Sequence, residues 1–261
     1  VNDILVQGAR PIFFLDYLAT GQLSPRISAE VVEGIARGCR ENGCALLGGE
    51  TAEMPGFYQD GEYDLAGFIV GLVDRARIID GHTIVPGDVL IGLPSTGLHT
   101  NGYSLARRIL FDELGFGLEQ EIDEWGCSVG EELLRPHCSY QAAVRPTIDT
   151  GCVKGIAHIT GGGLTDNVPR ILPEGCNAVI DSRAWPVPRV FEFLQKHGDV
   201  PVDDMYRTFN MGIGLVIVCS RSDLDSVLTK LISSGEVGAG PVGEIREGES
   251  AVTYADVEFL K

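Results

Sequence analysis

Two carboxylates and a hydroxyl stand between a glycine pair and a Pro-Gly turn in the segment Gly48–Gly56, which reads Gly-Gly-Glu-Thr-Ala-Glu-Met-Pro-Gly. Such a segment offers little apolar surface for a core. It follows the apolar run Cys44–Leu47, which predicts a short buried strand, so we expect Glu50 and Thr51 just beyond that strand's carboxyl end. Because α/β sheets commonly bind ligands at this edge, the pattern indicates a binding loop.

Asp3 provides another carboxylate near the start of the chain. It follows Asn2 and precedes the apolar residues 4–6, after which the chain turns into a predicted strand at Ile12–Asp16. A single aspartate near a terminus is more often a helix cap or a solvated group. Two carboxylates from different loops can hold a hard cation that binds nucleotide phosphates, as Mg²⁺ does. We therefore hypothesise that Asp3 and Glu50 meet as a Mg²⁺ site.

His158 and the segment Thr160–Gly163 place a titratable ring and three glycines between a predicted strand and a predicted helix. Glycines let backbone N–H groups approach an oxyanion closely, and a helix N-terminus favours a phosphate. A flexible turn beside a hydrogen-bonded core histidine is the alternative. The adjoining histidine and threonine favour an anion site.

Ser95–Gly102 is another polar, glycine-bearing loop, and it leads into a predicted helix at Tyr103–Leu110. Its hydroxyls, His99 and Asn101 can contact a ligand. Alternatively, the loop is a linker in which Asn101 caps the helix.

Composition excludes several classes of protein. The 261 residues include 20 Lys and Arg against 37 Asp and Glu, and the net charge of −17 repels nucleic acid and anionic membranes. This charge does not exclude a small phosphorylated ligand, because backbone N–H groups and a bound cation supply local positive potential. The sequence lacks the P-loop, the G-x-S-x-G elbow and the H-E-x-x-H motif, so the corresponding enzyme classes have no support.

Cysteine usage and hydropathy indicate the cellular compartment in which the protein works. The seven cysteines are scattered and form no C-x-x-C pair, which argues against a disulfide framework and a zinc knuckle. No apolar run approaches the roughly 20 residues that cross a bilayer. We expect a cytosolic protein with no membrane or nucleic-acid partner.

The predicted elements indicate two mixed α/β units. A helix is expected from Ser28, as its N-cap, to about Cys39. The change from an apolar strand to a polar, glycine-bearing loop after Pro94 predicts domains at 1–95 and 96–261. Before the boundary we expect strands at Ala45–Leu47, Asp64–Val73 and Asp88–Gly92. After it we expect strands at 155–159, 177–181, 212–219, 237–245 and 251–257, and helices at 131–144, after 163, at 190–196 and at 223–233.

Five motifs together resemble the aminoimidazole ribonucleotide synthetase family, whose members are also called phosphoribosylformylglycinamidine cyclo-ligases. In chain order they are Val1-Asn2-Asp3 with Gln7-Gly8-Ala9, Gly48–Gly56, Gly97–Ser104, His158–Gly163 and Met205–Asn210. The resemblance runs over essentially the whole chain, and Gly-Gly-Glu-Thr-Ala-Glu-Met-Pro-Gly is far more specific than a single glycine loop.

The resemblance implies a two-domain fold and a homodimer. The N-terminal strands of two copies would pair into a β-barrel, and the C-terminal domain would be an α/β sandwich. It also implies a ligase of purine biosynthesis that uses ATP to close formylglycinamidine ribonucleotide into 5-aminoimidazole ribonucleotide. ATP would phosphorylate the formyl oxygen, a nitrogen would attack the activated carbon, and phosphate would leave.

The family's functional positions carry over to this chain residue by residue. Asp3 and Glu50 resemble the metal and ATP-phosphate positions, with Asn2 and Thr51 beside them. The substrate's ribose phosphate would be held by a loop whose members are Thr160, Gly161, Gly162 and Gly163, and Asn101 with Gly102 would line the same cleft. His158 is the candidate for proton transfer, because neutral imidazole titrates near working pH.

One part of the family pattern has no match. The family's Asp-Gly-Val-Gly-Thr-Lys loop and a lysine-bearing segment precede the Asn-Asp motif, and nothing in this chain resembles them. We therefore expect the 261-residue chain by itself to be inactive, with its adenine pocket undefined.

Related families stay open as alternatives. A selenophosphate synthetase, a thiamine-phosphate kinase, a formylglycinamidine synthetase or a non-catalytic binding module would share the architecture. The long glutamate-bearing motif favours the cyclo-ligase. The presence of Asp3, Glu50 and His158 argues against a module without chemistry.

Overall fold

The computed structural model describes residues 1–255 of the chain, which divide between Ile78 and Ile79 into two compact units. The structure therefore differs from the predicted boundary near residue 95. The strand at Val89–Pro94 pairs on both sides with strands of the second unit, so residues 79–95 belong to that unit. The change to polar residues after Pro94 corresponds to a loop within the second unit and not to a domain junction.

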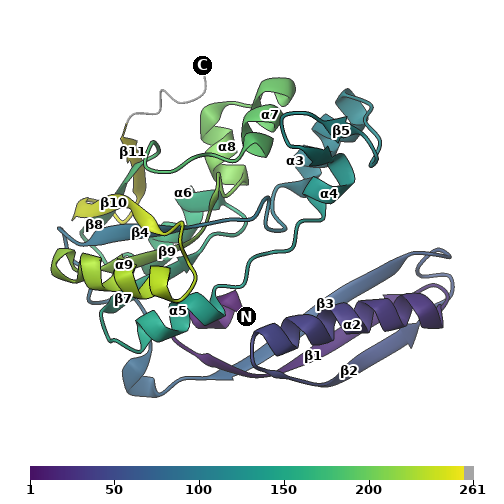
Figure 1. Cartoon of the computed structure of the whole chain (residues 1–261), viewed down its shortest axis with the longest axis horizontal. Helices are drawn as coiled ribbons and strands as arrows, with labels where there is room; N and C mark the ends of the chain where they lie inside the picture. The colour runs from purple at the N-terminus through teal and green to yellow at the C-terminus, as the bar shows by residue number, and fades with distance from the viewer. Residues whose placement is uncertain (256–261) are drawn as a thin grey trace. The chain divides into compact units, whose positions relative to one another are not determined.

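The first unit is a three-stranded sheet with one long helix (Figure 1). Its elements are α1 (Asn2–Leu5), β1 (Arg10–Thr20), α2 (Pro25–Glu41), β2 (Ala45–Glu53) and β3 (Tyr63–Leu72), followed by a 3₁₀ turn at Arg75–Arg77. β1 lies in the centre, parallel to β2 and antiparallel to β3. α2 makes the crossover that a parallel pair requires, and it packs on both strands that it connects.

Two details of this unit correct the sequence-based expectations. α2 begins at Pro25, after Ser24, and not at Ser28, because proline's fixed φ and missing N–H suit the first helical turn. β2 continues to Glu53, so Glu50 and Thr51 lie within the strand and not beyond it. Gly49 permits this close pairing, because a Cβ there would overlap the carbonyl of Asp16.

The second unit is built on a six-stranded sheet in the order β11-β8-β10-β4-β9-β7. Its strands are β4 (Val89–Pro94), β7 (Val153–His158), β8 (Cys176–Asp181), β9 (Ile213–Cys219), β10 (Gly240–Glu247) and β11 (Val252–Ala255). All neighbours are antiparallel except β11 and β8. The predicted last strand reached 257, and its final two residues lie outside the described part of the chain.

Helices cover both faces of this sheet (Figure 1). The helices of this unit are α3 (Tyr103–Arg107), α4 (Val129–Leu133), α5 (Gln141–Ile148), α6 (Gly163–Asn167), α7 (Arg189–Gly198), α8 (Val202–Thr208) and α9 (Leu224–Ser233), with a π-helical stretch at Arg108–Glu113, 3₁₀ turns at Val168–Ile171 and Arg221–Asp223, and a small hairpin of β5 (Glu121–Ile122) and β6 (Cys127–Ser128). α5 packs with α9, and α6 packs with α8. No helix in residues 1–255 combines the length and the apolar character needed to cross a bilayer.

The single helix expected at 131–144 is two helices, α4 and α5, joined by residues 134–140. Pro136 explains the break, because proline disfavours the helical conformation of the preceding residue and lacks an N–H for the helix ladder. The joining segment is a loop that carries His137 and Cys138. The expectations also missed α8, which covers part of the Met205–Asn210 motif.

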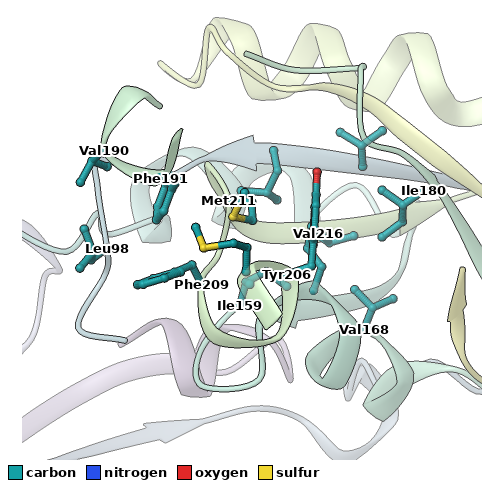
Figure 2. Close-up of a cluster of buried hydrophobic side chains, with 14 of the residues drawn as sticks. Leu98, Ile159, Val168, Ile180, Val190, Phe191, Tyr206, Phe209, Met211 and Val216 are labelled. Atoms are coloured by element: carbon teal, nitrogen blue, oxygen red, sulfur yellow. The ribbon is translucent and has the colours of Figure 1, made fainter. Parts of the chain in front are cut away.

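The core of the second unit lies between the sheet and α6, α7 and α8 (Figure 2). Phe191 of α7, Tyr206 of α8, Phe209 and Val216 of β9 belong to one cluster of buried side chains, and all four are essentially inaccessible to solvent. Because side chains alternate along a strand, Leu215 and Ile217 face the opposite side of the sheet. Burial of such side chains stabilises the fold by about 1.5–3 kcal/mol each, so this unit provides a rigid base for its loops.

Candidate functional site

The two glycine-bearing loops of the second unit lie side by side. A Cβ placed on Gly161 would be 3.6 Å from Oδ1 of Asn101, so the Ser95–Gly102 and Thr160–Gly163 loops lie within contact distance of one another. Gly102 has φ of +77°, and a Cβ there would overlap the ring of Phe209. A Cβ on Gly163 would overlap the carbonyl oxygens of Tyr206 and Phe209, so both loops pack on the same motif, Met205–Asn210.

The side chain of Asn210 holds the Ser95–Gly102 loop in place through hydrogen bonds. Its Oδ1 accepts hydrogen bonds from Ser95 Oγ and the backbone N–H of Gly212, each at 2.8 Å, and its Nδ2 donates to the Gly97 carbonyl at 2.8 Å. The side chain is 1% exposed. A buried amide satisfied in this way fixes the loop, because leaving its groups unpaired costs about 1–3 kcal/mol.

Asn167 holds the Thr160–Gly163 loop. Its Nδ2 donates to the carbonyls of Gly163, Gly161 and Thr160 at 2.8, 3.2 and 3.3 Å, and its Oδ1 accepts from Thr160 Oγ1 at 3.0 Å. α6 begins at Gly163 but has only five residues, so its dipole adds little. Any capacity for an anion in this loop therefore comes from backbone N–H groups.

Three of the chain's five histidines gather beside these loops. Nε2 of His137 lies 3.0 Å from Nε2 of His158, and the ring of His137 stacks on that of His99 with a centroid distance of 4.1 Å. His99 is 2% exposed and its Nδ1 has no hydrogen-bond partner. Burial, with the neighbouring rings of His137 and His158, lowers the pKa of His99 to about 3, so this ring is neutral at working pH.

The backbone beneath His99 is strained. His99 and Thr100 have φ of +54° and +65°, in the left-handed region that side chains with a Cβ rarely adopt. Each costs on the order of 1–2 kcal/mol. Nε2 of His99 accepts from the backbone N–H groups of Thr96 at 2.9 Å and Cys138 at 3.3 Å, and these bonds keep the turn in place.

A cavity of about 380 Å³ opens beside the first residues of the same loop. It is lined in part by Ser95, Thr96, Trp125 and Arg189, together with the ion pair of Glu132 and Arg135. The Arg135 Nε lies 2.5 Å from the buried Glu132 carboxylate, so its charge is already compensated.

The predicted phosphate and metal residues all lie in the first unit. Asn2 is buried in α1, which also carries Asp3, while Glu50 and Thr51 are exposed on β2. Asp3 is therefore helical and not in a loop.

Within one copy, the strand register separates α1 from Glu50. Ile4 of α1 packs at Gly71, which is paired with Pro11, whereas Glu50 is paired with Tyr17. Six residues of β1 separate these pairing positions, about 20 Å at the usual rise. Among residues 1–255 no group of three or more His, Cys, Asp or Glu side chains could hold a metal ion. One copy of the chain thus does not form the hypothesised site from Asp3 and Glu50.

Sequence reasoning missed His137, Asn167 and Asn210. His137 lies in a stretch whose apolar spacing predicts a helix, and only Pro136 signalled a loop there. Asn210 bonds Ser95 and Gly97, which are 115 and 113 residues away along the chain, and spacing does not reveal such contacts. Asn167 bonds residues only four to seven positions before it, but nothing in its type or spacing marks it as the residue that holds the loop. By contrast, the structure does bring together the predicted residues Asn101, His158 and Thr160–Gly163 within one unit.

Comparisons with known proteins match both units. The N-terminal domain of AIR synthase related proteins matches residues 1–73, and the C-terminal domain of the same proteins matches residues 85–255. A phosphoribosylformylglycinamidine cyclo-ligase of Geobacter metallireducens is 56% identical over 257 residues, which is 98% of this chain and 74% of the relative. One of Syntrophotalea carbinolica is 52% identical over 97% of this chain and 73% of the relative. The chain thus spans about three quarters of these relatives' length.

Solved structures share the fold at low identity. The hydrogenase maturation protein HypE, in a complex with ATP, has a TM-score of 0.71 and 18% identity over 97% of this chain and 72% of that chain. A thiamine-monophosphate kinase from Stenotrophomonas maltophilia has a TM-score of 0.71 and 19% identity over 97% of this chain and 74% of its own. These likenesses support a mixed α/β architecture.

Proposed function

Because the chain belongs to the phosphoribosylformylglycinamidine cyclo-ligase family, we propose that it converts formylglycinamidine ribonucleotide and ATP into 5-aminoimidazole ribonucleotide, ADP and phosphate. Identity of 56% across both units carries this proposal. The long glutamate-bearing motif on β2 and the paired loops of the second unit support it.

The reaction joins a nitrogen to a formyl carbon. ATP phosphorylates the formyl oxygen, the nitrogen attacks the activated carbon, and the carbon–oxygen bond breaks with its electron pair leaving on phosphate. The attacking nitrogen loses a proton, and we assign that proton to His158. Backbone N–H groups of Thr160–Gly163, with Asn101 and Gly102 beside them, would hold the substrate's phosphate.

ATP is the co-substrate, and we place its phosphates at the first unit with Asn2, Asp3, Glu50 and Thr51. One copy of the chain does not fit Mg²⁺ between Asp3 and Glu50, because α1 and Glu50 meet β1 about 20 Å apart. No step above is therefore assigned to a metal.

A homodimer accounts for the separation of Asp3 and Glu50 within one copy of the chain. β2 and β3 expose large apolar side chains that water disfavours, among them Leu47 (66% exposed), Phe68 (61%) and Leu72 (67%). We propose that this sheet pairs with the sheet of a second copy in a β-barrel, and that Asp3 of one copy works with Glu50 of its partner.

Mixing two inactive variants of the complete enzyme tests that arrangement. Asp3→Asn and Glu50→Gln should each abolish ATP-dependent ring closure, and refolding them together should restore about a quarter of the wild-type rate, since half of the dimers are hybrids with one intact site. No recovery would place both residues in the same copy's site. Mixing Asp3→Asn with itself is the matched control.

The proposed reaction is tested by incubating the complete enzyme with formylglycinamidine ribonucleotide and ATP. The aromatic amine of the product can be diazotised and measured by its colour. We expect His158→Ala to reduce the rate and His82→Ala, at an exposed histidine, to leave it unchanged. If the enzyme hydrolysed ATP only with thiamine monophosphate or selenide, it would belong to one of the related enzyme families instead.

We also propose that the protein works in the cytosol. All seven cysteines are thiols, as a reducing compartment maintains them.

A further inference from the structure

The buried amide of Asn167 sets the direction of several peptide groups in the Thr160–Gly163 loop. The side chain is 2% exposed, and its Nδ2 lies 2.8, 3.2 and 3.3 Å from the carbonyl oxygens of Gly163, Gly161 and Thr160. A carbonyl oxygen can only accept, so the nitrogen of the amide, and not its oxygen, faces these groups. The hydroxyl of Thr160 donates to Oδ1 at 3.0 Å, which agrees with this orientation.

The opposite side of the loop therefore presents N–H groups. In a trans peptide, the N–H of one residue points away from the carbonyl of the residue before it, and the described residues contain no cis peptide. Because the carbonyls of Thr160 and Gly161 face Asn167, the N–H groups of Gly161 and Gly162 point to the other side. No described residue accepts a hydrogen bond from either N–H group. The N–H of Gly163, by contrast, donates to the Thr160 carbonyl at 3.0 Å.

Two successive N–H groups on one side of a turn form a concavity that suits an anion. Both belong to residues that precede α6, so they act without the dipole of that short helix. The Asp166 carboxylate opposes them, since a Cβ on Gly162 would lie 2.8 Å from its Oδ2. An anion bound here must therefore gain more from the N–H groups than it loses to Asp166.

We propose that Asn167 is a positioning residue for phosphate recognition. By holding the carbonyls of Thr160 and Gly161, it keeps the N–H groups of Gly161 and Gly162 directed at the phosphate of a ribose 5-phosphate group. That this phosphate belongs to the ribonucleotide substrate rests on the proposed function, whereas the direction of the N–H groups rests on geometry. Asn167 itself does not contact the phosphate.

Nuclear magnetic resonance of the complete enzyme labelled with ¹⁵N-glycine tests the direction of the N–H groups without any need for turnover. The probe is ribose 5-phosphate, and ribose without the phosphate is the control ligand. We expect ribose 5-phosphate to shift the amide resonances of Gly161 and Gly162 in a saturable way, because a phosphate oxygen that accepts a hydrogen bond deshields the donated hydrogen. Ribose should leave both resonances in place.

Asn167→Ala tests the positioning role in the same titration. Without the amide, the carbonyls of Thr160 and Gly161 can turn toward water, so the affinity for ribose 5-phosphate should fall about tenfold, the equivalent of one lost hydrogen bond. Asn167→Ser, whose hydroxyl can donate to a single carbonyl, should lose less. Asn177→Ala is the matched control, because it removes another buried asparagine, which donates to Thr253 Oγ1, and it should bind the probe as the wild type does.

Asp166→Asn should have the opposite effect at the neighbouring position. Removing the carboxylate beside Gly162 should tighten the binding of ribose 5-phosphate about threefold, the size of an exposed charge interaction. An affinity unchanged by Asp166→Asn would place the phosphate away from Gly162 and would contradict the proposal.

Turnover of the complete enzyme provides a readout that loss of stability alone would not change. Asn167→Ala should raise KM for formylglycinamidine ribonucleotide about tenfold with kcat within about threefold, because the phosphate is held equally in the ground state and the transition state. Asn177→Ala should leave KM unchanged. A loss of kcat at unchanged KM would overturn the positioning role.

The outcomes separate this inference from the proposed function. If Gly161 and Gly162 do not respond to ribose 5-phosphate in a wild-type enzyme that forms the imidazole product, the role of Asn167 is refuted and the function stands. If the wild-type enzyme forms no such product, the function is refuted, while the role of Asn167 still depends on the titration.

Discussion

His99 makes the stability of the second unit depend on pH. Its pKa is about 3 in the folded chain, against 6.5 for an ordinary histidine. Between those values the unfolded chain binds a proton that the folded chain does not, so the free energy of unfolding falls as pH is lowered through this window. The slope is at most about 1.4 kcal/mol per pH unit.

We predict that acidification from pH 6.5 to 5 lowers the free energy of unfolding by up to about 2 kcal/mol through His99. Urea titrations at both pH values measure this difference. His99→Gln should remove that part of the change, whereas His82→Gln should retain it. A wild-type protein equally stable at both pH values would show that His99 is protonated in the folded state.

Asn210 gives a prediction independent of pH. Asn210→Ala leaves a carbonyl, a hydroxyl and an N–H without their partner in a buried place, and should cost about 3 kcal/mol in urea unfolding. Asn42→Ala, which removes the bond from Nδ2 to the Gly38 carbonyl at the end of α2, should cost less than Asn210→Ala. Similar losses in both variants would mean that water replaces Asn210 in its site.

At the scale of elements, the junction of β7 and α6 depends on Gly163. Its φ is +58°, and a Cβ there would overlap the Tyr206 carbonyl oxygen. Gly115 has a similar φ of +68° with open space around it. The two positions therefore separate the cost of the backbone conformation from the cost of a clash.

We predict that Gly115→Ala costs about 1 kcal/mol, from conformation alone, and that Gly163→Ala costs about 3 kcal/mol or more. Denaturant midpoints of the two variants give the comparison. Equal costs would mean that α6 shifts away from α8 without loss, and the loop would then be less firmly held than its contacts imply.

Elements defined by local sequence could be predicted well. The apolar runs around Val216 and Ile91 are long enough to identify β9 and β4, and both ends of α9 were predicted to within one residue. Strand ends that are set by pairing with a neighbouring strand could not be predicted from the sequence. β2 extends through Gly48 and Gly49 because β1 offers a partner along its whole length, which no propensity of β2 itself indicates.

The candidate site was predictable only in part. The glycines and Asn101 stand out because a polar loop between apolar strands has no role in a core. His137 did not, since its partner His158 is 21 residues away and its own segment has helical spacing. Asp3 and Glu50 were paired on chemistry alone, and the strand register separates α1 from Glu50 within one copy.

At the scale of the whole molecule, self-association should depend on the sheet of the first unit. We predict that Phe68→Glu on β3 shifts the protein from dimer to monomer in light scattering, because a charge replaces apolar surface in the interface. Val237→Glu changes a residue that is 79% exposed in the second unit and should leave the dimer intact. A dimer that survives Phe68→Glu would place the interface elsewhere.

The order of strands in the second unit also has a consequence for synthesis on the ribosome. β4 is made early in this unit, yet both of its neighbours, β9 and β10, come late, and β10 begins about 150 residues after β4 ends. At ~5–20 residues per second, roughly 7 to 30 s pass between them. During that time an apolar strand with two unpaired edges is exposed to other nascent chains. The sheet of the second unit can therefore close around β4 only near the end of synthesis.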